Sequence, residues 1–149
     1  MTELESTQTA RAPWHLWVIG VVAVLWNAVG AYDYVMTETK NPAYMSAFTP
    51  EQVAYFYAFP AWAVATWAIA VWGGVLGAIL LLLRRRIAVP VFLVSLVAMI
   101  ITTLYNFVLS NGLEIFADTG SRLLTFMIFL IALGLYFYAR AMSKRGVLV

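Results

Sequence analysis

Three polar side chains, Asn27, Asp33 and Tyr34, interrupt an otherwise apolar run near the start of the chain. Polar groups are costly inside a membrane, so each of them indicates a functional site by default. Asn27 and Tyr34 share one helix face, and Asn27, near the middle of the bilayer, needs a hydrogen-bond partner on another helix. Asp33 lies near the helix end. There it is either a buried acid that carries a proton or binds a cation, or an interfacial carboxylate paired with Lys40 or Arg122.

Tyr105 and Asn106 form a second polar pair in a later apolar run. With Thr102 they follow the i, i+3, i+4 spacing, which makes a polar stripe along one helix face. Together with the first group and a tryptophan, they are expected to line a small cavity that opens outward. Neutral hydrogen-bonding groups mixed with aromatic faces suit a sugar, polyol or other small neutral ligand better than an anion. The candidate ligand-binding residues are Asn27, Asp33, Tyr34, Trp67, Tyr105 and Asn106.

No residue pattern typical of catalysis accompanies these groups. The chain has no cysteine and a single histidine, His15. Thiol chemistry, a bis-histidine haem and a histidine-rich metal centre are therefore excluded within one chain. The sequence also lacks a nucleophile motif, a glycine-rich phosphate loop and a zinc-binding HExxH motif. We expect no enzymatic activity, no catalytic residues, no metal and no cofactor.

The composition indicates a membrane protein. Of the 149 residues, 64% are hydrophobic and 11% are charged, and the mean hydropathy is +0.88. A soluble domain carries about 25% charged residues. The deficit excludes an ordinary soluble protein, a disordered chain and an extended nucleic-acid-binding protein. The predicted partner is the lipid bilayer, and no nucleic acid is expected.

Four uncharged runs are candidates for membrane spans, since about 20 apolar residues cross the hydrocarbon core of a bilayer. We predict an all-α, integral membrane four-helix bundle that forms a single domain over residues 1–149. A capping box from Thr49 to Gln52 begins the second helix, and Pro60 kinks it. The predicted helices cover about 14–36, 50–83, 87–109 and 122–141, and the predicted cytoplasmic tails cover 1–13 and 142–149.

The distribution of lysine and arginine predicts that both termini are cytoplasmic. In that orientation only Lys40 and Arg122 lie outside, which agrees with the positive-inside rule for an inner-membrane protein. A cleaved signal peptide is the alternative for the first run, but Glu3 and Glu5 and the length of the run argue against it. The residues expected inside are Arg11, Arg84, Arg85, Arg86, Arg140, Lys144 and Arg145.

The second predicted helix carries a stripe of small residues. Small residues at intervals of four let membrane helices approach closely. The stripe is either a packing surface within the bundle or the interface of a homodimer. Its members are Ala70, Gly73, Gly74, Gly77 and Ala78.

Several segments resemble one group of proteins. These segments are Leu25–Tyr34, Phe48–Gln52, Phe59–Trp62 and Tyr105–Leu109. They are similar to small bacterial inner-membrane proteins with four predicted helices that are often labelled sugar transporters. The resemblance runs from Trp14 to Arg140 and implies transport of a small solute, but it supplies no binding residues.

Three functions remain open from the sequence. The first is a transporter or binder of a small neutral solute that acts as an oligomer, which predicts that Asn27, Tyr34, Tyr105 and Asn106 converge. The second is a structural or accessory subunit that docks other membrane proteins through an exposed glycine face. The third is a small proton-coupled multidrug exporter that uses Asp33.

Overall fold

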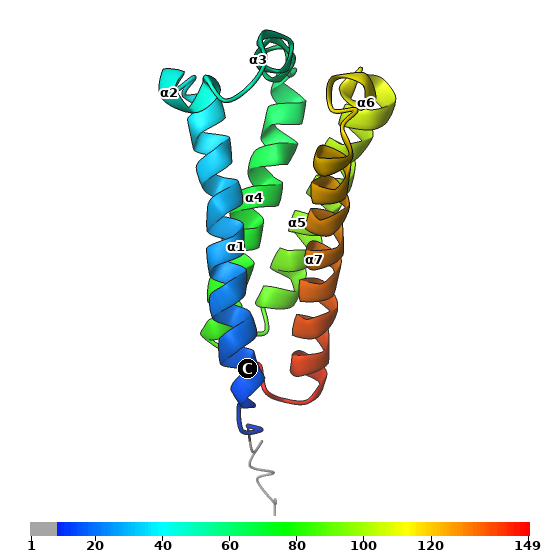
Figure 1. The fold of residues 1–149 in the computed structure, drawn as a ribbon. Helices are drawn as coiled ribbons and strands as arrows, with labels where there is room; N and C mark the ends of the chain where they lie inside the picture. Colours follow the sequence, from blue (N-terminus) through cyan, green and yellow to red (C-terminus); the bar gives the residue numbers. More distant parts are fainter. Residues whose placement is uncertain (1–8) are drawn as a thin grey trace, which may run out of the picture.

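The computed structural model describes residues 9–149, and the regular structure of this part of the chain is helical throughout. Four helices are long and apolar enough to cross a membrane, and they run side by side (Figure 1). This is the architecture of a multi-pass membrane protein. The four are α1 (Trp14–Glu38), α4 (Ala61–Leu82), α5 (Ala88–Leu104) with its π-helical continuation η1 (Tyr105–Leu109), and α7 (Thr119–Lys144).

Three short helices, α2 (Pro42–Met45), α3 (Pro50–Tyr57) and α6 (Gly112–Ile115), lie together at one end of the molecule. They are opposite the C-terminus (Figure 1). We call this end the aromatic end, and the other, which holds the turn at Arg84–Arg86, the basic end. The predicted capping box at the start of α3 is confirmed, because the side chain of Thr49 accepts from the Gln52 amide and that of Gln52 accepts from the Thr49 amide.

The helix predicted over 50–83 is divided into α3 and α4. The chain leaves α3 after Tyr57, and Pro60 adopts an extended conformation and caps α4. Proline has no amide hydrogen and disfavours a helical conformation in the residue before it, so a proline at this point ends one helix and begins the next. The predicted kink is therefore a break, which allows α3 to turn away from the axis of α4.

The prediction of a solvated C-terminal tail at 142–149 is also wrong. Helix α7 continues to Lys144, and the residues after it fold back into the core. Val147 and Leu148 are buried, and they belong to the same apolar core as Leu16 and Leu81. Arg84 anchors this segment, because its guanidinium donates to the Val147 carbonyl at 2.9 Å. The main core therefore lies at the basic end. The predicted tail at 1–13 is only partly described, since residues 1–8 lie outside the described residues.

The glycines of α4 allow it to pack closely between two neighbours. A side-chain carbon added at Gly73 would meet Ser95 of α5, and one added at Gly77 would lie 2.7 Å from two ring carbons of Phe92. At Gly74 it would overlap the side chain of Asn27 in α1. Gly74, Gly77 and Ala78 are buried, and the carbonyl of Ala70 accepts a 2.6 Å hydrogen bond from Ser95. The stripe therefore packs largely against α1 and α5 of this chain, although Ala70 and Gly73 are only half-buried.

Candidate functional site

Aromatic rings from four elements gather at the aromatic end of the molecule. Trp67 of α4 joins α1 to this group, because its ring lies 5.0 Å from Tyr34 of α1 and 6.0 Å from Phe59. Phe59 in turn lies 5.0 Å from Tyr105 of η1. Edge-to-face and offset contacts at these distances are favourable for aromatic pairs. We call this group the aromatic cluster; its members are Tyr34, Tyr55, Phe56, Phe59, Trp67, Tyr105 and Phe116.

Asn106 reaches the same cluster through a hydrogen bond. The Tyr55 hydroxyl donates to Asn106 Oδ1 at 2.6 Å, and it lies 2.8 Å from the Ser110 hydroxyl. Burial raises the pKa of Tyr55, although the bond to Ser110 opposes this shift, so the hydroxyl remains a neutral donor at physiological pH. Four of the six predicted ligand-binding residues are therefore connected here, although Phe59 and Tyr55 join them and the predicted residues do not line one cavity by themselves.

Asn27 lies outside this cluster, in the middle of α1. Its Nδ2 donates to the carbonyl of Ala23 in its own helix at 2.8 Å, and its Oδ1 faces Gly74 of α4. The predicted hydrogen-bond partner on another helix is thus wrong, because the neighbouring surface is a glycine with no side chain to offer. Asn27 acts as a packing residue that fills the space above Gly74.

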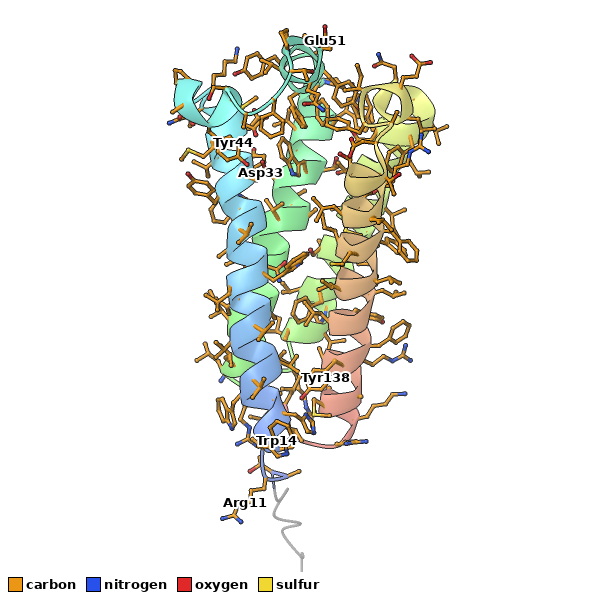
Figure 2. The ribbon with its side chains drawn as sticks, viewed as in Figure 1. Arg11, Trp14, Asp33, Tyr44, Glu51 and Tyr138 are labelled. Carbon is orange, nitrogen blue, oxygen red and sulfur yellow. The ribbon has the colours of Figure 1, made fainter. Side chains whose placement is uncertain are left out.

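Asp33 is linked to the aromatic cluster only indirectly, because its partner Tyr44 contacts Phe48, and Phe48 contacts Phe56. Asp33 accepts a 2.5 Å hydrogen bond from the hydroxyl of Tyr44 in α2, and Figure 2 shows the two side chains pointing toward one another. The pKa of Tyr44 is raised by its burial and by this hydrogen bond, which favour the protonated phenol. The partner of Asp33 is therefore Tyr44, and neither Lys40 nor Arg122 takes the role that the sequence suggested.

A pocket of about 220 Å³ opens beside the aromatic cluster. It combines rings with a hydroxyl group and two opposite charges from the end of α1. Phe56 and Phe59, which line it, also contact Trp67. Sequence reasoning did not single out this pocket, because its position depends on the break at Pro60. The lining residues are Thr37, Glu38, Lys40, Phe56, Tyr57, Phe59 and Val64.

Lys40 has an unusual backbone in this pocket. Its φ of 54° lies in the left-handed region, where a helix normally places glycine. Amide hydrogen bonds from Lys40 to Thr37 and from Asn41 to Met36 close the Schellman motif that ends α1. The conformation holds the Lys40 ammonium 4.7 Å from the centre of the Tyr57 ring, a favourable cation–π distance. Lys40 is exposed, and its ammonium lies over the ring of Tyr57, which also lines the pocket.

In the described part of the chain, no three His, Asp or Glu side chains gather where they could hold a metal ion. The single histidine, His15, shares a 2.5 Å hydrogen bond with Tyr138 at the basic end, far along the chain from the pocket.

Comparison of the chain with known protein families, with curated proteins and with solved structures gives no match.

Proposed function

We propose that this membrane protein binds a small polar solute without net charge, such as a sugar or polyol, in the pocket at its aromatic end, as a step in transport. The proposal rests on one observation: two opposite charges, Glu38 and Lys40, line the same pocket of about 220 Å³ as several aromatic rings. That volume is below the range typical of drug-sized ligands, so the solute is small.

The chemistry of the pocket favours a polyhydroxyl compound. The Glu38 carboxylate only accepts hydrogen bonds and the Lys40 ammonium only donates them, whereas the hydroxyl groups of a sugar do both. Thr37 adds a further hydroxyl, and the rings of Phe56 and Phe59 supply an apolar surface for carbon–hydrogen faces. Because the two charges cancel, neither an anion nor a cation is favoured overall.

The first prediction concerns Lys40→Gly. Glycine adopts a positive φ without strain, so the variant is expected to unfold at the same temperature as the wild type or a higher one. Loss of a charged hydrogen-bond donor weakens binding by about 10-fold or more. Binding is measured by tryptophan fluorescence in detergent against monosaccharides, polyols, sugar phosphates and amines, since Trp67 contacts two pocket rings.

Two controls accompany this titration. Lys40→Arg retains a cation near Tyr57 and is expected to keep most of the affinity. Trp67→Phe removes the reporter and should silence the signal, while equilibrium dialysis still detects the bound solute. Unchanged affinity in Lys40→Gly, or a clear preference for the sugar phosphates or amines, would contradict the proposal.

The orientation that goes with this function places the pocket on the outer face of the inner membrane of a bacterium. It is supported by the seven basic residues at the end opposite the pocket, against Lys40 and Arg122 at the pocket end; the seven are Arg11, Arg84–Arg86, Arg140, Lys144 and Arg145. The chain has no cysteine, so single introduced cysteines report their side of the membrane unambiguously. We expect an impermeant maleimide to label Glu51→Cys in intact cells and Arg85→Cys only after permeabilisation. The reverse pattern would place the pocket inside.

The other two functions have less support. An accessory subunit was expected to dock through the glycine stripe of α4, but Asn27, Ser95 and Phe92 pack against that stripe. For a proton-coupled exporter, Asp33 would have to exchange protons with a substrate site, whereas its partner is Tyr44 in the short helix α2.

A further inference from the structure

A groove separates α1 and α7 in the half of the molecule near the basic end. Its volume is about 520 Å³, and its walls are almost entirely apolar. Val22 and Trp26 contribute from α1, and Gly134 and Leu135 from α7. Figure 1 shows these two helices in front of α4 and α5, so the groove lies on the side of the molecule away from them. In a membrane, this groove faces the lipid.

The length and depth of the groove match one leaflet of a bilayer. The lining residues of α1 run from Val18 to Trp26, about 12 Å along the helix axis at 1.5 Å per residue. One leaflet contributes about 15 Å, half of the hydrocarbon thickness of about 30 Å. Since α1 begins at Trp14, this stretch lies in the leaflet at the basic end.

Gly134 keeps the groove open. A side-chain carbon added there would meet nothing within 4 Å, so no other part of the described chain fills the space. Glycine inside a helix costs up to about 1 kcal/mol relative to alanine. A large side chain at this position would extend into the groove.

At its basic end the groove is bounded by a hydrogen-bonded pair of side chains, with basic residues nearby. His15 and Tyr138 share their hydrogen bond across it, and Tyr138 also lines the groove. The basic side chains near this end of α1 and α7 are exposed, whereas all five acids in the described residues belong to the other end of the molecule or the last turns of α1. The exposed basic residues are Arg11, Arg140, Lys144 and Arg145.

From this arrangement we infer that the groove binds an anionic phospholipid of the leaflet at the basic end. One acyl chain lies between α1 and α7 against Gly134, and the phosphate lies near the exposed basic residues. Basic clusters next to openings between membrane helices bind anionic headgroups in this way. A second copy of the chain would explain the apolar walls. At a two-fold interface, however, the four basic residues of one copy would lie close to the same four residues of the other, and these like charges repel. An anionic phospholipid accounts for both the apolar walls and the basic residues.

Native mass spectrometry of the detergent-purified protein tests the inference. Palmitoyl-oleoyl phosphatidylglycerol and the phosphatidylcholine with the same chains are added at matched concentrations. We expect one phosphatidylglycerol to bind per chain with a clear preference over phosphatidylcholine. Gly134→Leu fills the groove and should weaken binding on the order of 10-fold, because buried methylene groups of the lipid lose their contacts. The matched control is Ala28→Leu, at an exposed position of α1 outside the groove, which should bind like the wild type.

A charge variant tests the headgroup site independently of the groove. Arg140→Gln combined with Arg145→Gln should reduce the preference for phosphatidylglycerol on the order of 10-fold and leave phosphatidylcholine binding unchanged. The control, Lys40→Gln with Arg122→Gln, removes the same charge at the other end and should keep the preference.

Three results would overturn the inference: equal binding of the two lipids, full binding in Gly134→Leu, or a wild-type dimer that Gly134→Leu dissociates while lipid binding persists. The last would assign the groove to a second copy. Because the pocket lies at the opposite end of the molecule, none of these results bears on solute binding.

Discussion

Gly77→Leu is expected to separate α4 from α5 and to prevent most of the protein from folding. A side-chain carbon at position 77 lies only 2.7 Å from the ring of Phe92, which is 3% exposed and has no room to move. Overpacking of this kind costs about 1–3 kcal/mol and sometimes more. Leucine also removes the close helix approach on which association in a membrane depends. The measurement is the yield of monodisperse protein in detergent, followed by thermal unfolding.

The matched control for this variant is Gly134→Leu. It makes the same substitution in another membrane helix, but at a position where nothing lies within 4 Å. We expect this variant to be recovered and to unfold at the wild-type temperature or a higher one, because leucine also favours a helix more than glycine does. If Gly77→Leu were as stable as Gly134→Leu, the packing of α4 against α5 described above would be wrong.

Arg84→Ala is expected to give the second largest loss of stability. The guanidinium donates to the carbonyl of Val147 at 2.9 Å and to that of Ala10 at 2.7 Å, so it joins both ends of the described chain to the turn after α4. Hydrogen bonds to charged groups contribute about 1.5–3 kcal/mol each. The side chain is only partly buried, so we expect a total loss nearer to about 3 kcal/mol. Thermal unfolding in detergent measures it.

Two further variants separate the contribution of the Arg84 side chain to stability from that of its backbone conformation. Arg85→Ala removes a neighbouring exposed arginine and should change stability little. Arg84 has a φ of 56°, so Arg84→Gly loses the same hydrogen bonds but relieves the strain of the left-handed conformation. It should therefore be more stable than Arg84→Ala. Equal stability of Arg84→Ala and Arg85→Ala would show that the guanidinium does not hold the chain ends.

The membrane-spanning helices could be predicted from the sequence because hydrocarbon imposes a simple rule. Each span needs about 20 apolar residues, and charges end it. The effect of Pro60 could not be predicted, because a proline kinks or breaks a helix according to how the freed backbone groups find partners. Here the amides of Ala58 and Phe59 bond to carbonyls of α3, and the Pro60 carbonyl accepts from Ala63 and Val64. The backbone groups at both new helix ends therefore have hydrogen-bond partners, which allows the helix to break at Pro60.

The burial of the last residues of the chain could not be predicted from the sequence either. Val147 and Leu148 follow a basic segment, and such a segment resembles a solvated tail. Their burial depends on Gly146, which takes a φ of 71° and turns the chain back. It also depends on the guanidinium groups of Arg84 and Arg86, which donate to the carbonyls of Val147 and Leu148. These contacts join residues about 60 positions apart in the sequence, so local patterns do not reveal them.

None of the six predicted ligand-binding residues lines the proposed pocket, although some of them lie in the aromatic cluster beside it. Tyr34, Trp67 and Tyr105 belong to one cluster, as the sequence predicted, but Phe59 joins them. Phe59 stands in the short segment between α3 and α4, so its direction follows from the break and not from helical periodicity. Asn27 was assigned to the site because a buried amide needs a partner. Its own helix supplies that partner at Ala23, which helix periodicity alone does not reveal.

The most direct test of solute binding is protection of a single cysteine in the pocket. Val64→Cys places a thiol in the pocket wall without removing a hydrogen-bonding group, and Glu51→Cys places one on the exposed surface of α3 as a control. The rate of modification by a small methanethiosulfonate reagent is measured with each member of the solute panel. We predict that an uncharged sugar or polyol slows modification of Val64→Cys in a saturable way and leaves Glu51→Cys unaffected. If no member of the panel protects Val64→Cys, or if protection is equal at both positions, the pocket is not a solute-binding site.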